Sequence, residues 1–167
     1  MKHILFLAGV AATSLFAGCS STPVALAPVG PNPAGIAGSA STGQLQVFSA
    51  LQGRSEGDDP AWFQHTGYTV CTPSGKTLLR VNNTAGYYEK APRSITLPEG
   101  RYLVKAQAKD YLRVHVPVVI ERGRITRVHL DDAWALPATS KETEVVSVPA
   151  GYPVGWSAGP AKEVRTN

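Results

Sequence analysis

The sequence predicts an all-β domain, and three observations support this prediction. Short runs of alternating apolar and polar residues recur between residues 44 and 130. Turn-forming Gly, Pro, Asn and Ser residues separate these runs about every 8–12 residues, a spacing typical of sandwiches and barrels. No window keeps the 3.6-residue period of an amphipathic helix, so we expect little helix.

The first eighteen residues have the composition of a secretory signal. Basic Lys2 precedes thirteen uncharged and mostly apolar residues, Ile4–Phe16. This run has the length of a signal-peptide core and is shorter than the roughly 20 apolar residues that a membrane span requires. Small residues Ala17 and Gly18 follow, and Cys19 comes directly after them. We therefore assign residues 1–18 to a signal peptide.

The segment LFAGC, which ends at Cys19, resembles the lipobox of bacterial lipoproteins. Phe16 stands where that family usually has Leu, and Leu15 lies one place earlier. The resemblance implies cleavage before Cys19 and acylation of its sulfur and its new amino group, which would anchor the chain in a lipid bilayer. Ser20, in place of Asp, implies the outer membrane, facing the periplasm. The alternative is an ordinary signal cleaved one or two residues earlier, which leaves Cys19 as a free thiol.

Residues 19–43 are predicted to form a flexible tether. From Ser20 to Gly43 the chain has four prolines and no charged or aromatic residue. Prolines favour an extended chain, and such a segment buries too little apolar area to offset the entropy of ordering it. We therefore expect the tether to be dispensable for folding. An irregular first strand over residues 23–29, PVALAPV, is the alternative.

Seven alternating runs form the predicted sandwich domain, which we place at residues 44–132. The predicted strands are 44–51, 67–72, 76–83, 93–97, 101–108, 111–120 and 124–130. The turn sequences TPSG, PEG and ERG each join two consecutive strands. In the run 111–120, Val116 and its neighbours at every second place should face the core, while the residues between them face solvent.

The last two of these strands are predicted to pair as a hairpin. Gly123 suits the left-handed last position of a three-residue loop, and we expect positive φ at Gly100 as well. With this loop the numbers of paired residues add to 244, so Val116 opposes Val128 on the inner face. A slip by one residue would turn one apolar face toward solvent, which disfavours other registers.

The same register places His115 opposite His129 on the outer face. Two facing imidazoles are candidate ligands for a transition metal, with a third ligand from elsewhere. The alternative is a pair of solvated histidines, and we favour it because no Cys or carboxylate lies at ligand spacing beside them. We therefore predict no metal site, and no motif in the chain indicates a cofactor.

Catalytic motifs are also not found in the sequence. Cys71 lies in an alternating run with no base nearby, which indicates a buried small apolar residue. The segment CTPSGKT resembles a phosphate-binding loop, but Val70 occupies the place of the required first Gly. No Ser/His/Asp arrangement and no paired carboxylates stand at motif spacing. We predict no catalytic residue.

The region Pro92–Leu130 resembles the PEGA domain and the related carboxypeptidase regulatory-like domains. The matching residues are Leu97, Pro98, Gly100, Tyr102, Val104 and, at the last turn, Gly123. Asp110 and Tyr111 stand where Gly-Tyr is usual. The resemblance implies a small antiparallel Greek-key sandwich of the prealbumin-like kind with about seven strands. Such domains are usually binding or spacing modules in envelope proteins.

The remaining residues, 133–167, are predicted to form an extended tail with one possible extra strand, TEVVSV. Among the aromatic residues outside the alternating strands, Tyr87 and Tyr88 are candidates for binding a sugar face or a partner protein. For Trp62 and Phe63 we favour the alternative role of filling an open end of the sandwich.

These observations favour a non-catalytic, membrane-anchored envelope lipoprotein whose sandwich binds or spaces. The expected partners are the lipid bilayer, through acylated Cys19, and an envelope protein or glycan. The formal charge of +4 falls to +3 without Lys2, and no basic cluster interleaves with aromatics, so nucleic acid is not expected. The alternative function is a carbohydrate-binding or accessory module of an envelope glycan-processing system.

Overall fold

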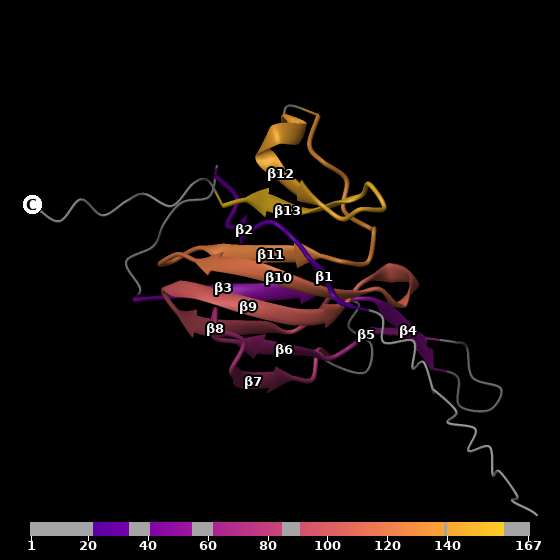
Figure 1. Cartoon of the computed structure of the whole chain (residues 1–167), viewed down its shortest axis with the longest axis horizontal. Coiled ribbons are helices and arrows are strands. Elements are labelled where there is room, and N and C mark those ends of the chain that lie inside the picture. The colour runs from indigo at the N-terminus through magenta and orange to yellow at the C-terminus, as the bar shows by residue number, and fades with distance from the viewer. Residues whose placement is uncertain (1–21, 34–40, 55–61, 85–90, 139, 159–167) are drawn as a thin grey trace, which may run out of the picture.

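A computed structural model of the 167-residue chain describes residues 22–33, 41–54, 62–84, 91–138 and 140–158. In these ranges the chain forms thirteen β-strands and two short 3-10 helices, with no α-helix (Figure 1). The all-β prediction is confirmed.

The elements follow one another along the chain from the N-terminal side. They are β1 (Val24–Ala25), β2 (Val29–Gly30), β3 (Thr42–Phe48), β4 (Leu51–Arg54), β5 (Trp62–His65), β6 (Tyr68–Cys71), β7 (Thr77–Val81), β8 (Ser94–Pro98), β9 (Gly100–Gln107), η1 (Lys109–Tyr111), β10 (Arg113–Ile120), β11 (Ile125–His129), η2 (Glu142–Glu144), β12 (Val145–Ser147) and β13 (Pro153–Ser157).

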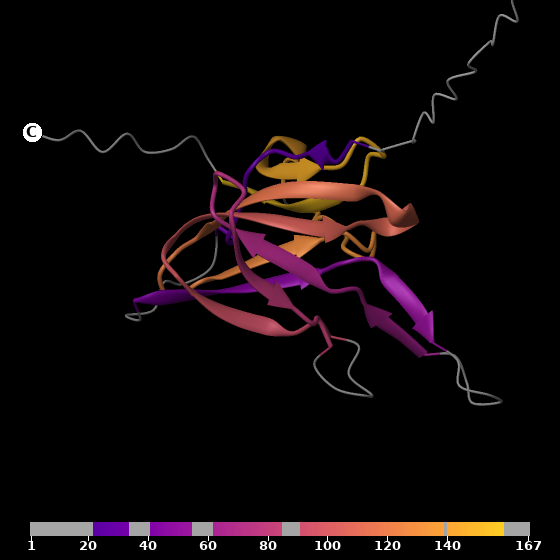
Figure 2. The same cartoon turned by 60° about the horizontal axis from the view of Figure 1, so that its bottom comes forward.

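Two sheets make up the sandwich. The larger has the strand order β12-β13-β2-β10-β9-β6-β7, and β1 also pairs with β10. The smaller has the order β11-β3-β8. Strands β4 and β5 form a separate hairpin that extends away from the sandwich (Figure 2). Strands β1 and β2 run parallel to β10, and β11 runs parallel to β3, so the sheets are mixed where the sequence predicted antiparallel pairing alone.

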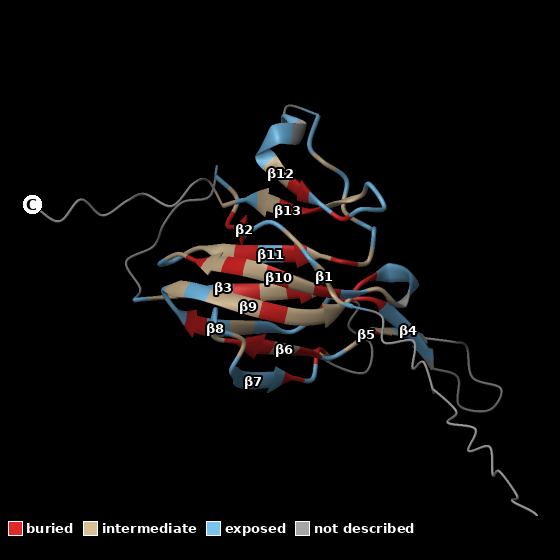
Figure 3. Cartoon of the chain, in the orientation of Figure 1, coloured by how far each residue is buried: buried red, intermediate tan, exposed pale blue. Residues whose placement is uncertain are grey.

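The core lies between the inner faces of the two sheets. In β10 every second residue from Val114 to Ile120 is buried, as the alternation predicted. Val128 of β11 and Val47 of β3 contribute to the same buried cluster from the smaller sheet. Burial alternates along β10 in the larger sheet and β11 in the smaller one (Figure 3). Alternation in the sequence therefore correctly predicted which side of β10 and of β11 faces inward.

The predicted hairpin between the last two core strands is wrong. Val116 of β10 pairs with Val104 of β9, and Val128 of β11 pairs with Val47 of β3. The loop after β10 thus carries the chain from one sheet to the other. Alternation shows that two strands each have a buried face, but strands that pair edge to edge and strands that pack face to face share this pattern.

The connection between β8 and β9 also crosses between the sheets, because β8 pairs with β3 and β9 with β10. Gly123, in the crossing after β10, has the expected left-handed φ of 66°. The positive φ predicted at Gly100 is also confirmed, with a value of 157°. The turn sequence TPSG does join two paired strands as predicted, because β6 and β7 form an antiparallel hairpin.

The predicted tether is wrong for residues 22–33. Strands β1 and β2 lie along the edge of β10, where Val24 pairs with Val114 and Val29 with Val118. Val29 is fully buried in the core. The prolines of this segment flank the two strands and do not interrupt them, so the alternative of an irregular first strand describes this region.

The C-terminal segment also joins the sandwich. Strand β12 confirms the extra strand predicted there, and β13, which was not predicted, lies between β12 and β2. Val154 of β13 is fully buried and Val146 of β12 nearly so. The predicted domain boundaries of 44 and 132 are therefore too narrow, because the described domain runs from residue 22 to residue 158.

Close backbone contacts hold both terminal segments against the sandwich. A Cβ atom at Gly155 would lie 2.6 Å from Val29 Cγ1 and 2.8 Å from the Arg127 carbonyl oxygen. The Arg124 guanidinium donates hydrogen bonds to the Asn32 carbonyl and to the Glu121 carboxylate. Only a residue without a side chain fits at position 155, where β13 passes over β2 and β11.

Candidate functional site

The outer face of the larger sheet carries a row of polar side chains. The register aligns Ala25, His115, Lys105, Thr69 and Arg80 across strands β1, β10, β9, β6 and β7. Neighbouring strands lie about 4.8 Å apart, so Lys105 and Arg80, on either side of Thr69, have backbones about 10 Å apart. Three successive strands therefore present two cations and a hydroxyl to the same side.

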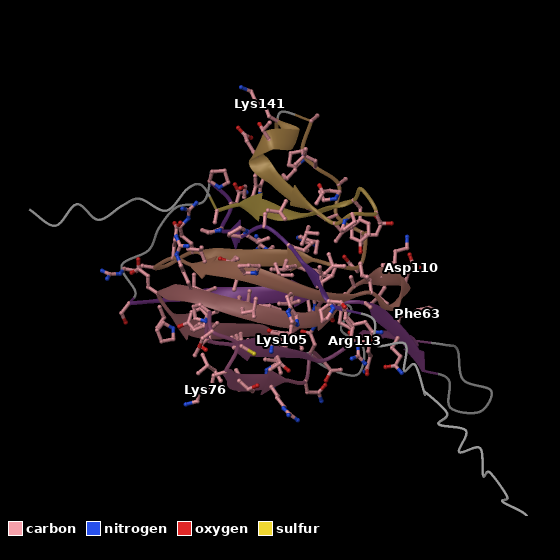
Figure 4. The ribbon with its side chains drawn as sticks, viewed as in Figure 1. Phe63, Lys76, Lys105, Asp110, Arg113 and Lys141 are labelled. Carbon is pink, nitrogen blue, oxygen red and sulfur yellow. The ribbon has the colours of Figure 1, made fainter. Side chains whose placement is uncertain are left out.

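A shallow groove of about 550 Å³ runs along this face. Its polar lining includes Arg80, Lys105, Arg113 and His115, and Pro23 lies at its N-terminal border. Figure 4 shows Lys105 and Arg113 on this side of the molecule, with Lys76 further along. We call this site, defined by Arg80, Lys105 and Arg113, the cationic groove.

The cationic groove has no acidic side chain in the part of the chain that the structure describes. None of the described strands contains Asp or Glu. The ion pairs found join Lys109 to Asp132, Arg122 to Glu99 and Arg124 to Glu121, all outside the groove. Lys105 Nζ donates a long hydrogen bond of 3.4 Å to the Gly75 carbonyl. Among the described residues, the positive charge of the groove is therefore uncompensated.

His115 lies in the groove beside Lys105. Burial, and then the positive charge of Lys105, lower the pKa of His115 below its ordinary value of 6.5. The imidazole is therefore mostly neutral at pH 7, and the positive charge of the groove comes from Arg80, Lys105 and Arg113.

The predicted facing pair of histidines is wrong. His115 pairs with Lys105 in the larger sheet, and His129 pairs with Phe48 in the smaller one. The two imidazoles thus belong to different sheets and cannot share a metal. No group of three or more His, Cys, Asp or Glu side chains suitable for a metal occurs among the described residues.

His129 instead lies within an aromatic stack. Its ring is nearly parallel to those of Phe48 and Trp134, at centroid distances of 4.3 Å and 5.0 Å. Trp134 in turn meets Trp156 edge to face at 5.9 Å. A hollow of about 110 Å³ lies beside this aromatic stack. Burial, Arg127 and His65, in that order, lower the pKa of His129 to about 4.

Ser49, His65 and Asn83 form a buried polar network at the base of the β4–β5 hairpin. The Ser49 hydroxyl donates to the Thr66 carbonyl at 2.5 Å, and His65 Nδ1 contacts the Ser49 carbonyl oxygen at 2.6 Å. Asn83 Nδ2 donates to the Val47 carbonyl and to Ser49 Oγ. The imidazole contacts the backbone of Ser49 and not its hydroxyl, so the network supports the fold and is not a nucleophile–base pair.

Several predicted site residues lie outside the described residues, namely Cys19, Tyr87 and Tyr88. Cys71 is fully buried, with Sγ 4.0 Å from Thr77 Oγ1, as expected for a small core residue. Phe63 is 61% exposed on the β4–β5 hairpin and fills no end of the sandwich. The side chain of Trp62 is not described.

Sequence reasoning missed the cationic groove. Arg80, Lys105 and Arg113 lie far apart along the chain and form no local cluster. The available signal was their shared position on the outward side of three alternating strands. The site can be recognised from this signal only when the strand order β10-β9-β6-β7 is known.

Searches of family models, of curated proteins and of solved structures find no match to this chain. None of the helices among the described residues is long and apolar enough to cross a bilayer. The fold and the site thus define a β-sandwich with an open, positively charged groove on one face.

Proposed function

We propose that this chain is a non-catalytic, lipid-anchored lipoprotein of the bacterial envelope, whose β-sandwich acts as a binding or spacing module. The observation that carries this proposal is the apolar run that ends in Ala17, Gly18 and Cys19. Its likeness to a lipobox supports acylation of Cys19, and Ser20 supports an outer-membrane location facing the periplasm. The likeness of residues 92–130 to PEGA-like domains supports the role of a binding or spacing module.

The chemistry of the described residues supports a non-catalytic role. The Ser49 hydroxyl and the Cys71 thiol are buried, and neither contacts an imidazole or a carboxylate. The alternative of a carbohydrate-binding module receives less support, because the stack covers both faces of the His129 ring and one face each of Phe48 and Trp134. A sugar ring would therefore be limited to the outer faces of Phe48 and Trp134.

Metabolic labelling tests the proposal. Cells that express the full chain with labelled palmitate should yield a labelled protein in the membrane fraction, and Cys19→Ser should remove both the label and the membrane association. Cys71→Ser is the matched control, because Cys71 is buried and should not be acylated. A Cys19→Ser protein that stays in the membrane fraction with unchanged mass would contradict the lipoprotein assignment.

A further inference from the structure

We propose that the cationic groove docks the domain onto the anionic phospholipid headgroups of the bilayer that holds acylated Cys19. This inference rests on the proposed lipid anchor, and it adds a second contact with the same membrane. Three features support it: the short chain between Cys19 and the groove, the positive charge of the groove, and the gain in binding that a tether gives.

The chain between the anchor and the groove is short. Pro23 borders the groove, and β1 begins at the next residue, Val24, so only four residue steps separate Cys19 from the groove. A fully extended chain spans about 3.3–3.6 Å per residue, which limits this separation to about 14 Å. Pairing of β1 with β10 holds the border in place. The groove therefore cannot move far from the membrane surface.

The groove is chemically suited to phosphate. Arg80 and Lys105 lie on either side of Thr69, and Arg113 lies two residues beyond His115 on the adjacent strand, about 8 Å diagonally from Lys105. Guanidinium groups bind phosphate oxygens through paired hydrogen bonds, and an ammonium acts as a point charge. No carboxylate among the described residues lines the groove and competes for these cations.

The lining of the groove favours headgroups over a sugar or an apolar peptide. The aromatic residue at the groove, Tyr68, is 4% exposed and forms part of the core cluster, so it offers no open ring face. The exposed large apolar side chains lie on the β4–β5 hairpin (Leu51 and Phe63) and on β7 (Leu78 and Leu79), and none of them lines the groove. A shallow, positively charged surface fits an array of phosphates.

Tethering makes weak charge contacts sufficient. The anchor turns docking into an intramolecular event at an effective concentration in the millimolar range for short linkers. At physiological salt the electrostatic potential of a charged membrane decays over about 8 Å, the same order as the linker's upper limit of about 14 Å, so cations near the border of the groove can lie within reach of the membrane charge. Each cation near an anionic surface strengthens binding about fivefold, and three cations should together contribute on the order of 100-fold.

Vesicle binding by the unacylated chain tests the groove directly. Residues 19–167 with Cys19→Ser, the product of the proposed processing without its lipid, are mixed with vesicles of phosphatidylcholine alone or with an equal part of phosphatidylglycerol. We expect binding to the anionic vesicles that weakens as salt rises, and little binding to the neutral ones. The triple variant Arg80→Gln, Lys105→Gln, Arg113→Gln should bind on the order of 100-fold more weakly.

A second triple variant controls for net charge. Arg122→Gln, Arg127→Gln and Lys141→Gln remove the same charge from positions outside the groove. This control should lose much less binding than the groove variant, and melting curves should show that both variants fold. Equal losses in the two variants, or equal binding to both kinds of vesicle, would overturn the proposal. Binding to soluble heparin but not to anionic vesicles would overturn it in favour of an anionic polymer.

Orientation of the acylated chain separates this inference from the anchor on which it rests. A fluorophore at Thr69→Cys in the groove should be quenched by headgroup-labelled lipid, while one at Thr96→Cys in β8, on the smaller sheet, should be quenched much less. Equal quenching at both positions in a palmitate-labelled protein would refute docking and leave the anchor intact. If palmitate labelling itself fails, the lipoprotein assignment fails, whatever the vesicles show.

Discussion

The central strands and the terminal strands of this sandwich differ in what stabilises their strand conformation. Strands β9 and β10 are eight residues long each, and their alternation is visible in the sequence. Strands β1 and β2 are two residues each, in a segment of Pro, Ala, Gly and Val that has no such pattern. The comparison teaches that a short segment can be ordered by the edge that a neighbouring strand offers, with little contribution from its own propensity.

The edge in question belongs to β10. Strand β9 pairs along one side of it, and β1 and β2 pair along the other, so β10 has no free edge over the paired residues. An open edge next to buried valines would invite pairing with another chain. Leu26 N donates to the His115 carbonyl at 2.9 Å and extends the coverage between the two short strands. Strand β13 then pairs with β2 and continues the sheet.

The strongest test removes the N-terminal strands. A chain that begins at Gln44 lacks Val29, exposes the edge of β10 and removes β2, one of the two strands that pair with β13. Burial of one Val stabilises by about 1.5–3 kcal/mol, and the lost pairing adds to this, in a domain whose total stability is of the order of 5–15 kcal/mol. By circular dichroism, we expect this truncated chain to be largely unfolded or to melt more than about 10 °C below the full mature chain.

A chain that begins at Thr22 is the control for this truncation. It removes only residues that precede the described domain and should melt with the full mature chain. If the chain from Gln44 melted as high as the chain from Thr22, β1 and β2 would be an accessory layer, and the original prediction of a dispensable tether would be right after all.

The second test targets the contact between the two terminal segments. Gly155→Val places side-chain atoms where even a Cβ would lie 2.6 Å from Val29 Cγ1 and 2.8 Å from the Arg127 carbonyl oxygen. Overpacking of this kind costs about 1–3 kcal/mol, so the melting temperature should fall by several degrees. Ser157→Ala, on the same strand at an exposed position, should melt close to the parent. A stable Gly155→Val protein would mean that β13 is loosely held.

The sequence predicted what depends on local pattern. Alternation correctly gave the fold class, the inward face of β10 and the hairpin β6–β7, whose turn holds Gly75 at positive φ. It could not give strand partners, because the burial of Val116 and Val128 is the same whether their strands pair or face each other. It also gave no signal for β2, since the burial of Val29 depends on neighbours more than eighty residues away in the chain.

The candidate site was unpredictable for the same reason. Arg80 and Lys105 lie on strands that flank β6, and the chain brings them together only because β6 pairs with both β7 and β9. The predicted pairing of His115 with His129 was wrong for the same reason, because it assumed that β10 and β11 pair with each other. Sites assembled across a sheet need the strand order, which period-2 patterns do not contain.

A third test compares the two crossings between the sheets. Gly123→Ala adds a Cβ at a φ of 66°, where L-residues are strained by about 1–2 kcal/mol. Gly100→Ala should cost at least as much, because its φ of 157° lies in a region that L-residues rarely adopt, although the new Cβ would lie at an ordinary contact distance of 3.6 Å from the Tyr102 ring. Melting curves should therefore rank the parent above Gly123→Ala, with Gly100→Ala level with or below Gly123→Ala. A Gly100→Ala protein that melts as high as the parent would mean that the crossing between β8 and β9 does not require a positive φ.

The smallest expected effect concerns His129, whose ring connects the core strand β11 to the C-terminal segment. This ring stacks on Phe48 of β3 and on Trp134, which follows β11. Burial is the main cause of its pKa of about 4, and Arg127 and His65 add to the shift. In the unfolded chain the pKa returns to about 6.5. Between these values the unfolded state therefore binds more protons than the folded state.

The free energy of unfolding should then fall as the pH drops from about 6.5 toward 4, and His129 should have no effect above that window. The full shift corresponds to roughly 3 kcal/mol, and we expect about 1–2 kcal/mol because the ring is partly exposed to solvent. His129→Phe keeps a flat ring in the stack and removes the titration, so urea unfolding at pH 7 and pH 4.5 should show a smaller loss than in the parent. The raised pKa of Asp131, which burial causes, acts in the opposite direction at low pH and is present in both proteins, so it cancels in the comparison. If the parent and His129→Phe lose the same unfolding free energy between pH 7 and pH 4.5, the stack does not bury this imidazole. The C-terminal segment would then be less firmly joined to β11 than β1 and β2 are to β10.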